Sequence, residues 1–260
     1  MINKINKKLI KNKFLKAKPF NYVVIDNFWN KKTANLLHKE ITKFSLKNTN
    51  AHYDNAIEKK LVCNHYDKFD HNLYNAFSYL NSSLFLQIIK KITGIKKIIP
   101  DIGLHGGGLH IHPSGGKLNV HKDYSIHPKL KMERRLNLII YMTKNWKAKW
   151  GGELQLWSHD KKKNQPLKLE HKILNKFNRA ILFDTTQNSW HGLPNEIKMP
   201  KGTLRNSIAI YYLTQPRKKS ERRGKALFSP TEKQKNDKNV LTLIKKRANE
   251  NLATKTYRMK

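Results

Sequence analysis

Apolar residues in the first hundred positions recur mainly at intervals of three and four, which is the spacing of one buried helix face. This pattern predicts a helix that follows an Asn30 N-cap and runs to about residue 44. It also predicts a longer helix over residues 73–92, which Gly94 terminates. The apolar run at 22–28 predicts a strand. We expect both helices to pack against a sheet.

From residue 104 onward, short apolar runs alternate with glycine, proline and polar turns, which is typical of a β-sandwich or barrel. The runs predict strands near residues 107–112, 117–121, 136–142, 153–157, 180–184 and 206–213. The predicted fold class is therefore mainly β with supporting α-helices.

Three segments lack such a pattern. Residues 1–19 are rich in lysine and predict a loose basic arm or a frayed first helix. Residues 45–70 are polar and turn-prone. Residues 216–260 predict a mobile basic C-terminal tail, in which only residues 240–244 could form a short helix. A single domain over residues 20–215 remains, and it is long enough to bury its own core.

Composition narrows the setting more than the function. With one cysteine, Cys63, the chain can form no internal disulfide and no cysteine-based metal site, which favours a reducing compartment. The N-terminus lacks the apolar segment of a secretory signal, and the chain has no run of eighteen apolar residues. We therefore expect a cytoplasmic protein without a membrane span.

The net charge of +35 arises from 53 lysines and arginines against 18 acidic residues, and it would attract nucleic acid, anionic lipid or acidic protein. Lysine, asparagine and isoleucine are all abundant, as in proteins encoded by AT-rich genomes. The charge is also spread along the chain rather than gathered in one block. We therefore treat it as weak support for a nucleic-acid partner, and for an acidic substrate.

A histidine and an aspartate two positions apart on a strand project from the same face and can bind one metal ion. The chain contains three His-x-Asp pairs, so the pair alone identifies nothing. Two of them, at 52–54 and 65–67, lie in the polar segment 45–70 and are interpreted as surface or capping residues. The third, His121 with Asp123, follows a predicted strand behind two glycines and is the candidate site.

His191 follows the buried run at 178–183 and precedes a glycine, so it could reach across a barrel to the first pair. Two histidines and one carboxylate on one face of a metal ion leave three positions open, the arrangement of non-haem Fe(II) oxygenases. Arg205 opens the next strand and could hold a carboxylate by two hydrogen bonds. Other histidines lie in charged, loop-like surroundings and are expected to be solvated: His127, His159 and His171.

In order, the relevant segments read LNVHKD, RRLNLIIYMTKNW, WGGELQLW, NRAILF, SWHGLP and RNSIAIYYL. This series resembles the 2-oxoglutarate- and Fe(II)-dependent dioxygenases of the prolyl-4-hydroxylase-like group, over about residues 20–215. The resemblance implies a double-stranded β-helix, or jelly-roll, core with a helical buttress. It also implies hydroxylation of an unactivated C–H bond, in a reaction that converts 2-oxoglutarate to succinate.

The resemblance implies roles for individual residues. Three would ligate iron: His121, Asp123 and His191. Arg205 would bind the distal carboxylate of 2-oxoglutarate, Tyr141 matches a tyrosine that helps to hold it in some relatives, and Ser207 could share that task. The implied cofactors are Fe(II), 2-oxoglutarate and O2, with ascorbate as an optional reductant. The implied substrate is a prolyl residue, another peptidyl residue or an amino acid, and the oligomeric state stays open.

Three other interpretations remain. His110 and His112 could begin a cupin motif, but no glutamate follows at 115–118, so these histidines are better suited to line a substrate mouth or fill a strand. A JmjC-type enzyme usually holds 2-oxoglutarate by an earlier lysine, which Arg205 argues against. The alternative from another class is a basic nucleic-acid-binding module with a structural or decayed metal site. It predicts strongly salt-dependent nucleic-acid binding without 2-oxoglutarate turnover.

Overall fold

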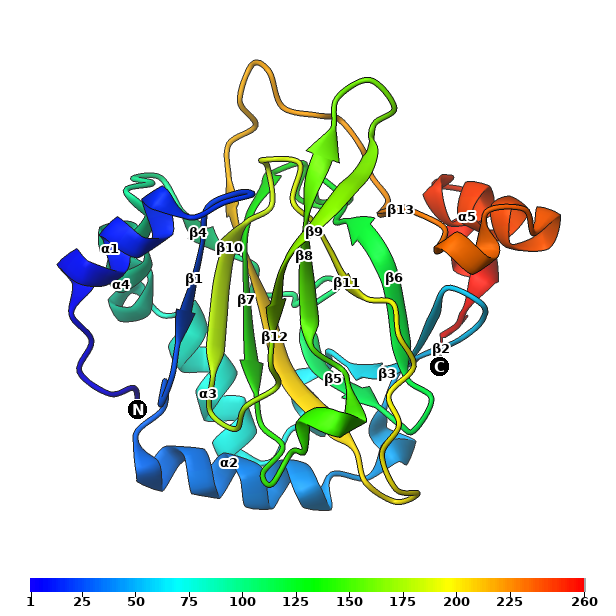
Figure 1. Cartoon of the computed structure of the whole chain (residues 1–260). Coiled ribbons are helices and arrows are strands. Elements are labelled where there is room, and N and C mark those ends of the chain that lie inside the picture. Colours follow the sequence, from blue (N-terminus) through cyan, green and yellow to red (C-terminus); the bar gives the residue numbers. More distant parts are fainter. Residues whose placement is uncertain (260) are drawn as a thin grey trace.

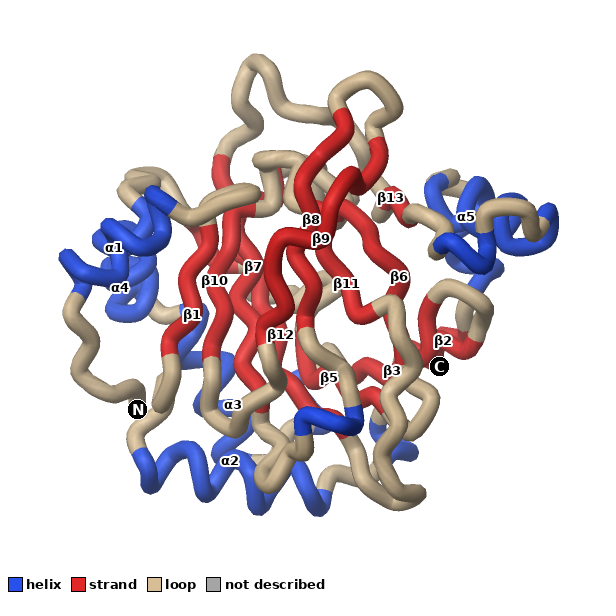
Figure 2. Tube along the Cα trace, viewed as in Figure 1, coloured by secondary structure: helices blue, strands red, loops and turns tan. Residues whose placement is uncertain are grey.

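The structure, a computed structural model, describes residues 1–259. Its strands form one mostly antiparallel sheet that curls into a half-barrel (Figures 1 and 2). The strands are β1 (Tyr22–Ile25), β2 (Ala51–Asp54), β3 (Glu58–Cys63), β4 (Ile99–Pro100), β5 (Gly108–His112), β6 (Lys117–Lys122), β7 (Glu133–Tyr141), β8 (Leu154–Asp160), β9 (Gln165–Ile173), β10 (Ala180–Asp184), β11 (Trp190–Leu193), β12 (Arg205–Thr214), β13 (Leu227–Phe228) and β14 (Arg258–Met259). All six strands predicted after residue 104 are present, and so is a strand at 22.

Along the curl, the hydrogen-bonded order is β1-β10-β7-β12-β5-β3-β6-β11-β8-β9. Strand β3 joins the two halves, because it pairs with β5 at one end and with β6 at the other. The half that contains β7 and β12 therefore faces the half that contains β6 and β11 across the interior. This is the jelly-roll core that the sequence resemblance implied.

Strand β12 is buried on both faces. Its alternate residues Ile208, Ile210 and Tyr212 point outward into the main hydrophobic core. The residues on the opposite face line the interior cavity: Arg205, Ser207, Ala209 and Tyr211. A strand alternates its side chains between two faces, so one strand serves both the helix-covered core and the site.

Four helices pack on the outer side of the sheet: α1 (Lys7–Lys16), α2 (Lys31–Lys43), α3 (His71–Asn81) and α4 (Ser83–Thr93). The Asn30 side chain accepts a hydrogen bond from the Thr33 N–H, and Gly94 ends α4 in the left-handed conformation, so both predicted caps are confirmed. The single helix predicted over 73–92 is wrong. Ser82 takes an extended conformation and its hydroxyl caps α4, so the chain bends there.

Two further predictions need correction. The segment 45–70, expected to be turns, contains β2 and the central strand β3. The sequence pattern hid β3 because its inward positions carry charged residues. At the N-terminus, α1 is a packed helix rather than a loose arm, since Phe14 is buried and α1 lies beside α4 (Figure 1).

The C-terminal residues also fold onto the barrel instead of forming a mobile tail. Helix α5 (Lys238–Ala248) covers the 240–244 segment that the sequence singled out. Strands β13 and β14 pair with β6 and β2, so they anchor the segment at two points. Val240 and Phe228 pack on Ile57 in a small hydrophobic cluster of their own. Within residues 1–259, no helix is long and apolar enough to cross a membrane.

Candidate active site

The three predicted ligands come from two paired strands. His121 lies on β6, Asp123 directly follows it, and His191 lies on β11 opposite His121 in the register. One donor atom from each residue lies within 4.8 Å of the others, and all three side chains are buried. Pairing of β6 with β11 therefore assembles a site from residues that lie 70 positions apart.

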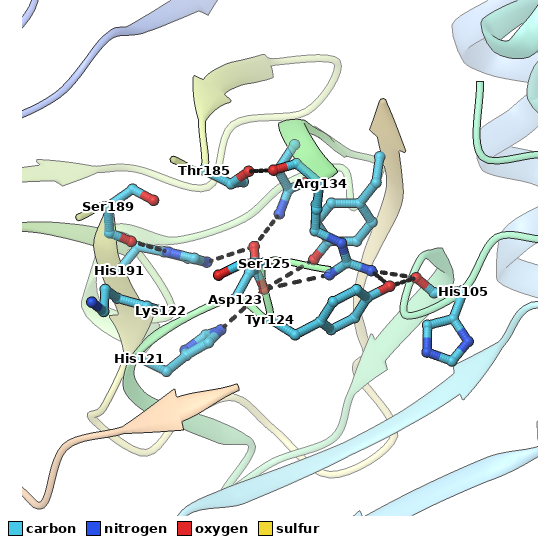
Figure 3. A network of polar contacts seen from close by, with 12 residues as sticks. His105, His121, Lys122, Asp123, Tyr124, Ser125, Arg134, Thr185, Ser189 and His191 are labelled. Carbon is cyan, nitrogen blue, oxygen red and sulfur yellow. Dashed lines mark hydrogen bonds and ion pairs between the residues drawn. The ribbon is translucent and has the colours of Figure 1, made fainter. Parts of the chain in front are cut away.

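Backbone carbonyls set the orientation of both imidazoles. His121 Nδ1 lies 2.9 Å from the Asn119 carbonyl oxygen, and His191 Nδ1 lies 2.8 Å from that of Ser189. A carbonyl only accepts, so each Nδ1 carries the proton and each Nε2 presents a lone pair. The two Nε2 atoms lie 3.7 Å and 3.8 Å from opposite oxygens of Asp123 (Figure 3). Metal-binding histidines are commonly oriented in this way.

The carboxylate of Asp123 is held from the opposite half of the barrel. The Tyr211 hydroxyl donates to one oxygen at 3.2 Å and the Asn137 amide to the other at 3.4 Å. Burial alone would raise the pKa of Asp123, but the neighbouring His121, His191 and Arg134 lower that pKa below its usual range. Burial lowers the pKa of His191 to about 4, so its ring is neutral near neutral pH. Two imidazole nitrogens and one carboxylate with free lone pairs fit a divalent iron ion.

Arg205 occupies the inner face of β12 and is buried. Its Nε donates to the Gly152 carbonyl at 3.0 Å, and its guanidinium carbon lies 4.8 Å from the centre of the Tyr141 ring. Gly152 has a φ of +73°, and a Cβ there would lie 3.2 Å from Arg205 Cδ. The Gly-Gly turn of WGGELQLW thus has a local purpose: it brings a backbone carbonyl against the arginine stem.

A row of polar side chains crosses three neighbouring strands beside Arg205. Ser207 is paired with Tyr141 on one side and His110 on the other, and Arg205 is paired with His112. Within the described residues, the buried Tyr141 hydroxyl and the Nε2 atoms of His110 and His112 have no hydrogen-bond partner. Burial lowers the pKa of His110 to about 3, so its ring is neutral. Buried polar atoms usually have partners, so this row fits a polar ligand held by Arg205.

Arg134 is a site residue that the sequence analysis missed. A register shift between β7 and β12 places it on the inner face together with Asn137. Its guanidinium carbon lies 3.3 Å from the ring centres of both Tyr124 and Tyr211, and it donates to the His105 carbonyl (Figure 3). Its Nη1 lies 3.8 Å from Asp123. The available signal was a pair of arginines near the start of a largely apolar strand, RRLNLIIY.

The other histidines lie apart from this cluster. His127 was expected to be solvated, but it is buried, with Nε2 3.6 Å from Asp101. His159 accepts a hydrogen bond from Trp190, and His171 packs against Tyr22. Within residues 1–259, the pairs at 52–54 and 65–67 form no metal-binding cluster.

The C-terminal segment forms part of the cavity wall. Strand β13 pairs with β6 at His121, and the Phe228 ring stacks on the His121 imidazole with a centroid separation of 5.0 Å. From α5, Arg247 donates to the buried Glu58 of β3 at 2.8 Å. The triad, these C-terminal residues and the polar row except Tyr141 line one cavity of about 210 Å³.

Comparison with known proteins places this geometry in context. Residues 107–213 match the family model described as the 2OG-Fe(II) oxygenase superfamily. No curated protein sequence matches the chain. Among solved structures, a Trichoplax adhaerens prolyl hydroxylase in complex with a peptide of hypoxia-inducible factor is 18% identical, with a TM-score of 0.57, covering 80% of this chain and 90% of that one.

Two other solved structures have the same fold. A Pseudomonas putida prolyl-4-hydroxylase is 14% identical, with a TM-score of 0.55, over 80% of this chain and all of that one. HygX from Streptomyces hygroscopicus, solved with nickel, 2-oxoglutarate and hygromycin B, is 10% identical, with a TM-score of 0.52, and the match covers 82% of this chain and 88% of that one. At these identities the likeness concerns the fold.

Proposed function

We propose that this chain is a member of the 2OG-Fe(II) oxygenase superfamily, whose family model matches residues 107–213, and that it hydroxylates an unactivated C–H bond of a prolyl residue or of another peptidyl or amino-acid substrate. The observation that carries the proposal is the convergence of three buried metal-binding side chains, with donor atoms within 4.8 Å of one another, in the cavity that also contains Arg205. Such a set leaves metal positions open for a cosubstrate and O2.

Each residue of the site has a proposed task. Three would hold Fe(II): His121, Asp123 and His191. Arg205 would bind the distal carboxylate of 2-oxoglutarate through Nη1 and Nη2, because its Nε donates to Gly152 and the contact of Nη1 with His112 Nδ1 is long, at 3.5 Å. The Tyr141 hydroxyl lacks a partner and lies beside this guanidinium, so it would donate to the same carboxylate. Ser207 lies next to Tyr141 in the register and would contribute a second hydroxyl.

When bound, iron and 2-oxoglutarate supply the oxidation: one oxygen atom of O2 enters the substrate as a hydroxyl group, and the other enters succinate as CO2 leaves. The protein then has to orient the substrate and exclude water, and it needs no general acid or base pair. His110 lines the cavity without adding a charge, because burial keeps its ring neutral.

The substrate class rests on the solved relatives with the same fold. Two of them are prolyl hydroxylases, one in complex with a peptide. These likenesses support a peptidyl substrate. The chemistry at the metal would be the same for a free amino acid.

The test measures succinate released from 2-oxoglutarate by purified protein with Fe(II), ascorbate and O2. The wild type should form succinate, and His121→Ala and Asp123→Ala should abolish it. Asp67→Ala is the matched control, since Asp67 belongs to another His-x-Asp pair, is exposed, and should leave the rate unchanged. Equal turnover by all four proteins would refute the proposal. Cell proteins that gain one oxygen with wild type, but not with Asp123→Ala, would then identify the substrate by mass spectrometry.

A further inference from the structure

Lys60 is a buried cation that the proposed reaction does not yet use. It lies on β3 between Glu58 and Val62 in the series of side chains that faces the cavity, and 12% of its side chain is exposed. Within the described residues its ammonium group donates no hydrogen bond. Its nearest carboxylate oxygen, on Glu58, lies 3.7 Å away, and the centre of the Tyr53 ring lies 4.9 Å away. Burial lowers the pKa of Lys60.

Glu58 cannot balance the charge of Lys60 by itself, because its single negative charge is also paired with Arg247. The Arg247 Nε donates to one Glu58 oxygen at 2.8 Å, and the other Glu58 oxygen has no hydrogen bond within the described residues. Two buried cations therefore share one fully buried carboxylate. A buried charge without a close partner costs free energy, so a fold retains one where a ligand supplies the missing charge.

The charge balance of the whole cavity points the same way. Two carboxylates line it, those of Glu58 and Asp123, together with five cations: Lys60, Arg134, Arg205, Lys225 and Arg247. Fe(II) with Asp123 and Arg205 would carry two net positive charges, which the 2-oxoglutarate dianion cancels. Four cations then face the single carboxylate of Glu58, so the loaded cavity keeps three uncompensated positive charges.

We propose that Lys60 binds a carboxylate of the substrate, so that the residue to be hydroxylated lies beside an acidic group. This inference rests on the proposed function and names its substrate class. The carboxylate can come from an aspartyl or glutamyl side chain, from the C-terminus of a peptide or from a free amino acid. In the low-dielectric cavity wall, the ion pair would form close to the metal site and would fix which residue approaches it.

The experiment compares matched substrates. Prolyl peptides carry Asp or Asn beside the proline, a second pair ends in a free carboxylate or an amide, and free proline is compared with prolinamide. Hydroxylation is followed by succinate release and by the mass increase of one oxygen. We expect the wild type to favour the carboxylate member of at least one pair by about tenfold or more in kcat/KM.

Lys60→Met should reduce that ratio to near one, and Lys60→Arg should keep most of it. Methionine retains the apolar stem, and Arg247 still pairs with Glu58, so no buried carboxylate is left unpaired. The control Lys59→Met changes the neighbouring residue, whose side chain does not line the cavity, and should keep the wild-type ratio.

Three outcomes would overturn the inference. The wild type does not discriminate within any pair, no carboxylate substrate stimulates turnover, or the ratio is unchanged in Lys60→Met. A large rise in the KM for 2-oxoglutarate with an unchanged peptide ratio would assign Lys60 to the cosubstrate instead. The two proposals fail separately. Absence of any succinate formation refutes the function, whereas succinate formation without carboxylate preference refutes only the role of Lys60.

Discussion

Two buried charged clusters line the cavity, and they are built in opposite ways. In the triad of His121, Asp123 and His191, a backbone carbonyl orients each imidazole, and Tyr211 and Asn137 hold the carboxylate. In the second cluster, which we call the Glu58 cluster, Lys60 and Arg247 share the single carboxylate of Glu58. Protein groups orient all three side chains of the triad, whereas the Glu58 cluster carries surplus charge.

This difference indicates how each cluster would meet its ligand. A preorganised set of donors suits a resident ion, because no reorganisation is needed when the ion binds. A cluster with one anion too few suits a transient ligand, because its charge is balanced only while that ligand is bound. The following predictions test the two halves of this contrast.

The largest effect is expected at the triad. Asp123→Asn keeps the size of the side chain but removes the negative charge that the metal requires. We expect the affinity for Fe(II) and the rate of succinate formation to fall by more than roughly a hundredfold. Bound iron is measured after dialysis, and succinate by mass spectrometry. Normal iron retention by the Asn variant would show that the aspartate is not a ligand.

In the Glu58 cluster, Glu58→Gln should destabilise the fold without directly touching the triad. It leaves the buried Lys60 and Arg247 without a counter-charge, so we expect the free energy of unfolding to fall by about 3 kcal/mol. Glu196→Gln is the control, because its ion pair with Lys117 is on the surface and should contribute less than about 1 kcal/mol. Urea unfolding of both variants measures the difference in the free energy of unfolding. Similar values for the two variants would contradict a stabilising role of Glu58 toward Lys60 and Arg247.

Arg205→Lys tests the proposed binding of 2-oxoglutarate by Arg205. Lysine keeps the charge but loses the planar donor pair and the bond to the Gly152 carbonyl. The KM for 2-oxoglutarate should rise by about tenfold to a hundredfold. Arg222→Lys changes an exposed arginine and serves as the control. If the KM stayed the same in Arg205→Lys, the guanidinium would have no role in binding.

The smallest effect concerns the glycine beneath Arg205. Gly152→Ala and Gly202→Ala both place a side chain on a residue with positive φ, and each should cost roughly 1 kcal/mol of stability. Only the Gly152 substitution meets Arg205, at 3.2 Å, so only it should also raise the KM for 2-oxoglutarate. Thermal unfolding and steady-state kinetics separate the two contributions. A raised KM in Gly202→Ala would mean that the turn does not act through the arginine.

The hydrophobic pattern of the sequence located those strands that bury apolar side chains on at least one face. Strands β7, β10 and β12 carry runs of aliphatic residues toward the helix-covered core, so their positions follow from the sequence. Strand β3 escaped detection because its inward face carries Glu58 and Lys60. A charged residue in a polar segment is normally solvated, and only a partner from α5, far along the chain, makes its burial tolerable.

The sequence by itself determined the order of the strands' apolar runs, the caps at Asn30 and Gly94, and the candidate residues His121, Asp123, His191 and Arg205. These features are local, since each depends on spacing within a few positions or on the order of short segments. The sequence could not identify Arg134 as a site residue, because the register shift between β7 and β12 decides which way that side chain points.

The tertiary structure alone decided which polar residues share one cavity. Pairing of β6 with β11 brings the ligands within reach of one ion, and the return of the C-terminal segment places Phe228 on His121 and Arg247 on Glu58. Contacts between residues so far apart in the chain follow from strand order and packing, not from local pattern. The surplus charge around Lys60 is therefore a property of the assembled barrel.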